Sequence, residues 1–206
     1  MANTSRINGF KPVRALGSGA ISGGLAAYAI GATENTVNCF VGDLVTFTGA
    51  GANITMTRGA YNGYTLPSVI PASATTDTYA GVVVGIIPDP DGTGGLSNTY
   101  ISGSESIDRV ILVDSNPESL FEVEADDTGG ITVAQIGLNV DPVFTAGNTT
   151  AGTSGHQVDS STAATTNTLG LRIINLVMKA DNAAGQYDKV VVKINKHAFA
   201  NQIAGV

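Results

Sequence analysis

The chain consists of short runs of β-branched, aliphatic and aromatic residues, interrupted every few positions by glycine, proline, asparagine or aspartate. Runs of this length and composition, bounded by turn-forming residues, are typical of β-strands. No long segment has the apolar period of 3.6 residues that an amphipathic helix requires. The pattern therefore predicts an all-β protein whose body is a small β-barrel or sandwich.

Local patterns place the individual strands. Residues 79–87 are apolar throughout, which predicts a strand buried on both faces. Residues 109–114 and 120–124 predict two strands joined by a turn, in which Pro117 supplies the fixed φ angle. The C-terminal strands within residues 169–196 have the strongest patterns, and the second of them alternates lysine with apolar residues.

Between these strands lie segments with few bulky side chains. Residues 145–168 are rich in threonine, glycine, serine and asparagine, which predicts a long flexible loop or a thin hairpin outside the core. Residues 131–138 predict one helical turn that ends at Gly137. Because 26 of the 206 residues are glycine, we expect a modest core between long Gly/Thr-rich connections.

Charge is distributed in three blocks. Residues 1–33 hold three basic residues and no acidic one, whereas residues 34–170 hold fifteen acidic residues and two arginines. Residues 171–206 hold five basic and two acidic residues. Basic ends around an acidic middle have two interpretations: they contact an acidic partner, or they pack on the acidic body of their own chain. The sequence favours neither.

The domain organisation follows from the same blocks. We expect residues 1–33 to form an extended basic N-terminal arm and residues 34–206 to form a single β-rich body. The region after Lys11 and Arg14 does not suit a secretory leader, because glycine and serine interrupt its apolar stretch. No apolar run reaches the ~18 residues of a membrane span, so no membrane partner is predicted.

Residue types that carry chemistry are few. A single cysteine, Cys39, excludes a disulfide within the chain, and its apolar neighbours indicate a buried thiol. Nucleophile-elbow, phosphate-loop and zinc-protease motifs are absent from the sequence. Ser154 precedes His156 by two positions, but its glycine-rich surroundings do not suit a positioned nucleophile. We therefore predict no enzymatic activity and no cofactor.

Two pairs of aspartates resemble the start of a calcium-binding loop. Asp89 and Asp91 form one pair and Asp126 and Asp127 the other, but neither has the further oxygen ligands that calcium needs. Solvated turns explain both, so no metal site is predicted, and a hydrolase or metal-dependent enzyme remains the alternative that calcium titration would test. A nucleic-acid partner is not expected, because the chain is acidic and has little arginine.

Five sequence blocks occur in order and together carry a family resemblance. They are GFKPVRALGSG, FVGDLV, GVVVGIIPDP, RVILVDSNPESLFEVE and LGLRIINLVMKADNAAGQYDKVVVKINKH. The set resembles tailed-bacteriophage structural proteins found beside the major capsid protein, of the capsid cement or decoration kind. It spans residue 9 to about residue 200, and its most distinctive parts are residues 9–16 and 193–197. The segment after residue 16 and the loop at 59–79 depart from the family pattern.

The resemblance implies a non-enzymatic homotrimer that binds the outside of an icosahedral shell and clamps neighbouring capsomers. Its partners would be the major capsid protein and other copies of itself. It would be made in the bacterial host cytoplasm and located on the capsid exterior of the virion. The alternative is another virion or surface β-protein, such as a tail tube, fibre or adhesin module, that uses residues 145–168 for recognition.

Two interfaces are expected on this interpretation. In the arm, Phe10 would supply an apolar contact, Pro12 a stiff extended backbone, and Lys11 and Arg14 charged contacts. The full arm anchor comprises Gly9, Phe10, Lys11, Pro12, Val13 and Arg14. The second expected interface is a basic strand face formed by Arg172, Lys189, Lys193 and Lys196.

Overall fold

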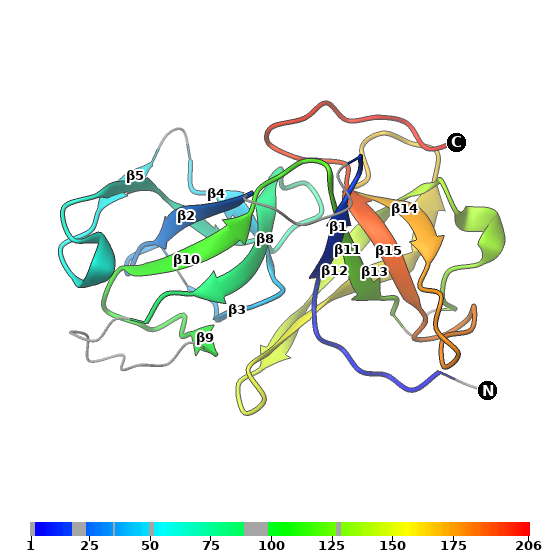
Figure 1. The fold of residues 1–206 in the computed structure, drawn as a ribbon, viewed down its shortest axis with the longest axis horizontal. Helices are drawn as coiled ribbons and strands as arrows, with labels where there is room; N and C mark the ends of the chain where they lie inside the picture. Colours follow the sequence, from blue (N-terminus) through cyan, green and yellow to red (C-terminus); the bar gives the residue numbers. More distant parts are fainter. Residues whose placement is uncertain (1–2, 18–23, 35, 50–51, 89–98, 127–128) are drawn as a thin grey trace.

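A computed structural model describes residues 3–17, 24–34, 36–49, 52–88, 99–126 and 129–206 of the chain. Strands make up 46% of it and helix only 3%, so the prediction of an all-β protein is confirmed. No helix in these ranges is long and apolar enough to cross a membrane. The strands form two curled antiparallel sheets that define an N-terminal lobe and a C-terminal lobe (Figure 1).

The N-terminal lobe is built on a five-stranded sheet of order β2-β10-β8-β4-β7. Its strands are β2 (Leu25–Ile30), β10 (Arg109–Asp114), β8 (Tyr79–Ile86), β4 (Leu44–Phe47) and β7 (Val69–Pro71). A bridge between Ala29 of β2 and Ser68, next to β7, brings the two edge strands together. The sheet therefore curls towards a barrel around apolar side chains that include Tyr28, Val83 and Ile111.

Two small ladders complete this lobe. β3 (Cys39–Phe40) pairs with β9 (Tyr100–Ile101), and β5 (Asn53–Thr55) pairs with β6 (Thr65–Pro67). A single 3-10 turn, η1 (Gly59–Tyr61), connects β5 with β6. In Figure 1 this hairpin lies at the end of the lobe that is farthest from the C-terminal lobe.

The C-terminal lobe is built on a six-stranded sheet of order β1-β11-β15-β14-β12-β13. Its strands are β1 (Lys11–Ala15), β11 (Ser119–Glu124), β15 (Lys189–Ile194), β14 (Leu171–Leu176), β12 (Asn139–Asn148) and β13 (Thr153–Ala164). A bridge between Ala125 and Val158 brings β13 to the end of β11 and curls the sheet. The helical turn predicted before Gly137 is confirmed as η2 (Val133–Gln135).

One apolar core runs through the junction of the two lobes. It includes Phe121 and Val192 from the C-terminal sheet together with Leu44 and Tyr79 from the N-terminal sheet. Backbone hydrogen bonds follow the same junction, because Tyr79 exchanges bonds with the chain at Lys196 and Ala198. The lobes are therefore packed parts of one body.

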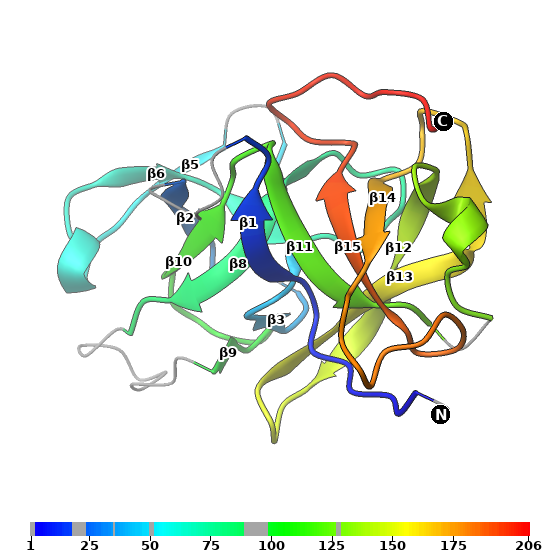
Figure 2. The same ribbon diagram turned by 45° about the vertical axis from the view of Figure 1, so that its right-hand side comes forward.

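The chain enters the C-terminal lobe twice. β1 lies there, the chain then builds the whole N-terminal lobe, and β11 begins the return (Figure 2). The two strands expected at 109–114 and 120–124 are confirmed as β10 and β11 within one residue, yet they belong to different sheets. The turn between them carries the chain from one lobe to the other and makes no hairpin.

Most of the segment at 145–168 lies in β12 and β13, so the expectation of a flexible loop is wrong and that of a hairpin is confirmed. The expectation that it lies outside the core is also wrong, because Val158 belongs to the core. β12 and β13 pair along their length, and Ser154, His156 and Val158 are buried. The small residues serve close packing: a Cβ on Gly155 would lie 2.3 Å from the Thr145 carbonyl oxygen. The hairpin also packs across the lobes, because a Cβ on Gly147 would meet the Phe40 ring.

The residues expected to form an extended arm are largely part of the body. β1 pairs with β11, and β2 is an edge strand of the N-terminal sheet. Phe10 is only 1% exposed and packs edge-on against Phe121, with ring centroids 6.5 Å apart. The division into an arm at 1–33 and a body at 34–206 is therefore corrected for the described part of the arm.

Candidate functional site

The two basic segments expected to form interfaces meet on one sheet of the C-terminal lobe. β1 carries Lys11 and β15 carries Lys189 and Lys193, and β11 lies between these two strands. Strand alternation sends Phe121 of β11 into the core and Glu122 to the outer face. A strand that carries glutamates is thus flanked by two strands that carry lysines.

The arm residues divide into buried and exposed sets. Lys11, Val13 and Arg14 are exposed on β1, which is an edge strand at this end of the sheet. The register with β11 shifts between Pro12 and Arg14, so β1 carries an irregularity of the β-bulge type. Proline, basic side chains and a bulge all oppose pairing with another strand at an edge. The exposed part of the arm anchor can therefore contact a partner through its side chains, and not by pairing its backbone with another strand.

Phe10 and Gly9 hold β1 to its own chain. The Phe10 amide donates a hydrogen bond to the Gly42 carbonyl oxygen at 2.9 Å. Gly9 has a φ of +63°, and a Cβ there would lie 2.5 Å from the same oxygen. The apolar contact expected from Phe10 is consequently made inside the subunit, which corrects that part of the anchor.

The basic strand face is smaller than expected. Lys196 follows the end of β15, turns inward to 8% exposure, and donates from Nζ to the Thr75 carbonyl oxygen at 2.9 Å. Arg172 donates to Asn139 Oδ1 at 3.1 Å and to the carbonyl oxygens of Ile203 and Ala204. Both side chains therefore hold parts of their own chain, and Lys189 and Lys193 remain on the outer face of β15.

Much of the remaining basic charge is compensated inside the subunit. Lys193 Nζ lies 2.5 Å from Glu118 Oε1, and Lys179 Nζ lies 3.0 Å from both carboxylate oxygens of Glu122. Glu124 is 3% exposed and accepts hydrogen bonds from the Ser5 hydroxyl and the Arg6 amide. Of the two interpretations of the charge blocks, packing of the ends on their own acidic body is the one these contacts support.

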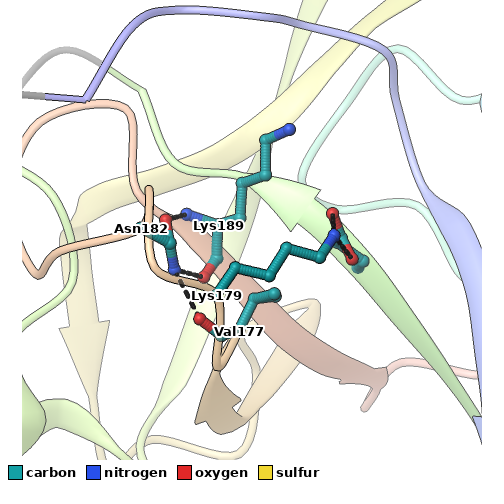
Figure 3. A network of polar contacts seen from close by, with 5 residues as sticks. Val177, Lys179, Asn182 and Lys189 are labelled. Atoms are coloured by element: carbon teal, nitrogen blue, oxygen red, sulfur yellow. Dashed lines mark hydrogen bonds and ion pairs between the residues drawn. The ribbon is translucent and has the colours of Figure 1, made fainter.

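The connection between β14 and β15 is fixed by one asparagine. Asn182 Nδ2 donates to the carbonyl oxygens of Val177 and Lys189 at 2.9 and 2.8 Å, and its Oδ1 accepts from the Lys189 amide at 2.7 Å. Figure 3 shows Asn182 beside these two residues and hydrogen-bonded to both, while the Lys189 side chain extends away from Asn182. The amide thereby closes the loop that precedes β15.

The N-terminal segment is tied to the same loop. Asn3 Nδ2 donates to the Ala183 and Gln186 carbonyl oxygens at 2.7 and 2.9 Å, and Asn3 Oδ1 accepts from the Ala183 amide at 3.0 Å. A pocket of about 340 Å³ lies between the two segments. Its lining residues are Asn3, Thr4, Arg6, Lys179, Asp181, Asn182, Tyr187 and Lys189.

No sequence pattern indicates this pocket. The strand pattern of β15 indicates Lys189, but Arg6, Lys179 and Tyr187 come from segments that look like ordinary connections. Their convergence depends on the contact between residues 3–6 and the β14–β15 loop, which no local pattern reports. The polar composition of residues 180–188 was the only available signal.

A second cavity, of about 410 Å³, lies where the β12–β13 hairpin crosses the N-terminal lobe. Phe40, Phe144, Asp43 and His156 are among its lining residues. His156 Nδ1 accepts a hydrogen bond from the Leu44 amide at 3.1 Å, which places the proton of the neutral ring on Nε2, 3.6 Å from Asp43 Oδ1. Burial lowers the pKa of His156 and raises the pKa of Asp43.

Ser154 lies beside this pair without forming a nucleophile–base arrangement. Its Oγ accepts a hydrogen bond from the His156 amide at 3.1 Å, and its hydroxyl lies next to the Asp43 carboxylate. Nucleophilic activation requires the hydroxyl to bond to the ring nitrogen of the base. The cluster instead joins β13 to the start of β4, across the junction of the lobes.

The other candidate groups have structural surroundings. Cys39 is buried, and burial together with nearby Asp43 raises the pKa of its thiol, which keeps it protonated. Asp126 accepts two hydrogen bonds from Ser160, whereas Asp89, Asp91 and Asp127 lie outside the described residues. Among the side chains that the structure describes, no group of three His, Cys, Asp or Glu is placed to hold a metal ion.

Comparisons with known protein families, with curated proteins and with solved structures found no match to this chain.

Proposed function

We propose that the chain is a bacteriophage capsid cement protein that binds the outer surface of an icosahedral shell and clamps neighbouring capsomers. The proposal starts from the ordered sequence blocks that resemble this family. Under this proposal, the partners are the major capsid protein and other copies of the chain, and the protein acts on the exterior of the capsid.

The observation that carries the proposal is the meeting of its two most distinctive blocks. Residues 9–16 contain β1, and residues 193–197 include the end of β15, although about 180 positions separate the two blocks in the sequence. Both strands pair with β11, on opposite sides. One sheet of the C-terminal lobe thus brings the two segments together, with Lys11, Val13 and Arg14 exposed on β1 and Lys193 partly exposed on β15. These side chains are the part of the two segments that a partner can contact.

This sheet offers exposed side chains suited to a protein partner. Lys11 and Arg14 provide charge, and Val13, 46% exposed, provides an apolar contact beside them. Each such contact is weak by itself, because exposed ion pairs contribute only about 0–1 kcal/mol. Binding through several copies in a closed trimer would multiply weak contacts into firm attachment.

Charge removal on β1 tests the proposal better than truncation does. Deleting residues 2–16 would also remove Phe10 from the core, so a loss of binding would have two explanations. We therefore expect Lys11→Gln with Arg14→Gln to weaken co-sedimentation with undecorated shells of the same phage. Arg58→Gln, in the N-terminal lobe, is the control with which the single variants Lys11→Gln and Arg14→Gln are compared, because each of the three removes one positive charge. Binding of the double variant at the wild-type level would overturn the assignment of β1.

The alternative, a tail tube, fibre or adhesin module that uses residues 145–168, draws on the exposed tip of the β12–β13 hairpin. Thr149, Thr150 and Ala151 are exposed there. The neighbouring Gly147 and Gly152 pack on Phe40 and Thr99 of the other lobe, which leaves a short surface for recognition. Size-exclusion chromatography with light scattering separates the two: a compact trimer supports the cement protein, and a monomer or open polymer supports the alternative.

A further inference from the structure

The pocket between residues 3–6 and the β14–β15 loop has a basic lining in an acidic protein. Its lining includes three basic residues, Arg6, Lys179 and Lys189, and one acidic residue, Asp181. Glu124 lies nearby, but it is almost fully buried and its carboxylate accepts bonds from Ser5 and Arg6. Within the described residues, no carboxylate lies within ion-pair distance of Lys189 Nζ or the Arg6 guanidinium.

The walls of the pocket are fixed before any ligand arrives. Asn182 closes the loop through three hydrogen bonds, and Asn3 fastens the N-terminal segment to it through three more. Lys179 is held at its position by both oxygens of Glu122. A preorganised site loses less conformational entropy on binding than a mobile one does.

Backbone strain marks the same place. Tyr187, which lines the pocket, has a φ of +58°, and among the described residues no other non-glycine has a positive φ. A bulky residue in this conformation costs about 1–3 kcal/mol and persists only where its surroundings hold it. The next residue, Asp188, is fully buried and accepts from the Ile131 amide at 3.2 Å, which anchors the strained position.

We propose that this pocket binds the carboxylates of an acidic polypeptide segment. Arginine and lysine supply several hydrogen-bond donors for carboxylate oxygens. The volume of about 340 Å³ falls in the range of ligand sites and is roughly ten times the ~30 Å³ that one water molecule occupies. Such a space suits a pair of acidic side chains better than a small inorganic ion.

The inference rests on the proposed function only for the identity of the partner, an acidic segment of a shell protein. Arg6 and Lys189 also line a second, small pocket, together with Lys11 of β1 and with Glu122 and Glu124 of β11. The pocket would therefore extend the contact surface of β1 by one binding site. Binding of a free acidic peptide does not require a shell, so the two proposals can fail separately.

The test uses the full chain and a labelled hexaglutamate peptide, with fluorescence anisotropy as the measurement. At low ionic strength, Lys189→Gln is expected to weaken binding about two- to fivefold, which is the range for one exposed ion pair, and Arg6→Gln with Lys189→Gln roughly tenfold. Asp181→Asn is expected to strengthen binding, a gain that misfolding cannot produce. Lys193→Gln is the matched control, because Lys193 lies on the same strand and is paired with Glu118 outside the pocket.

Three results would overturn the proposal. Lys189→Gln could leave the affinity unchanged, or Lys193→Gln could reduce it as much, which would indicate attraction to the whole surface. Inorganic phosphate alone could bind as tightly as hexaglutamate, which would make the pocket a small-anion site. If hexaglutamate binds as expected while shells are not bound, the pocket stands and the cement function fails.

Discussion

At the scale of residues, both histidines are buried and held through Nδ1 by a backbone amide. His156 accepts from Leu44 and His197 accepts from Phe199 at 3.1 Å. Burial lowers the pKa of both, and for His197 the nearby Lys193 adds to this, giving a value of about 4. Both rings therefore stay neutral at pH values at which the ring of an exposed histidine is already protonated.

The histidines should make the protein sensitive to acid. Because both folded pKa values lie below the unfolded value of about 6.5, the stability that the histidines contribute is complete above pH 6.5 and decreases as the pH falls below it. For His197 the loss extends down to its folded pKa of about 4. Asp188, with a pKa raised by burial to about 6, acts in the opposite direction as it protonates.

NMR titration of the two imidazole signals checks that both histidines have lowered pKa values. We expect neither signal to have a titration midpoint near pH 6.5. His197→Asn, which keeps an acceptor at the Nδ1 position, should flatten the decline of stability between pH 6.5 and 4. A titration midpoint of His197 at pH 6.5 would contradict the lowered pKa. An unchanged dependence of stability on pH in His197→Asn would contradict the contribution of His197 to acid sensitivity.

At the scale of elements, the sequence predicted most strands but few of their partners. The alternation in β15 placed Val190 and Val192 in the core, as observed, because strand side chains alternate strictly between faces. The pairing of β1 with β11, and the separation of β10 from β11 into two sheets, depend on contacts between distant segments. Turn signals show where a strand ends and not which strand lies beside it.

Local sequence patterns do not report contacts between distant segments, and this explains which residues of the candidate site were predicted wrongly. Phe10 looked available because it lies in a basic, glycine-rich segment, yet Gly9 turns it into the core. Lys196 lies three positions after Lys193, so the alternation of β15 places it on the side of Val192 and Ile194, and its side chain turns inward. The threonines and glycines of the β12–β13 hairpin are typical of a flexible segment, although small side chains also permit close packing of two strands and two lobes.

Truncation of Phe10 tests whether the N-terminal segment is part of the body. We expect Phe10→Ala to lower the free energy of unfolding by about 3–5 kcal/mol, because it removes a buried aromatic ring from the core. Val13→Ala, at an exposed position of β1, should change it by less than about 0.5 kcal/mol. Urea unfolding measures both, and equal effects of the two substitutions would show that residues 9–14 form a free arm.

Asn182 tests the closure of the β14–β15 loop. Asn182→Ala leaves the Lys189 amide and two carbonyl oxygens without their partner, which should cost about 1–3 kcal/mol. Hydrogen exchange at the Lys189 amide should accelerate, whereas Asn201→Ala, at an exposed position, should leave it unchanged. Unaltered exchange in Asn182→Ala would show that the strand alone holds the loop.

At the scale of the whole molecule, several contacts tie the lobes into one body. Lys196 donates to Thr75, Phe10 to Gly42, and Leu44 to the His156 ring, and each bond joins the C-terminal lobe to the N-terminal lobe. The shared apolar core crosses the same junction. A rigid body of this kind can transmit load between two contact points, which a clamp between capsomers would need.

The lobes should consequently unfold together. We expect calorimetry to give a single transition whose calorimetric and van't Hoff enthalpies agree. The experiment uses protein at low concentration, so that dissociation of any oligomer does not broaden the transition. Two resolved transitions would show that the lobes are independent domains and that the junction contributes little.

The most direct measurement of the central claim is an electron cryomicroscopy reconstruction of the phage particle that contains this chain. We predict density for the protein on the outside of the capsid, in trimers between capsomers, with β1 and the adjoining face of β15 directed towards the shell. Density located in the tail or inside the capsid, or trimers attached through the N-terminal lobe alone, would contradict the account.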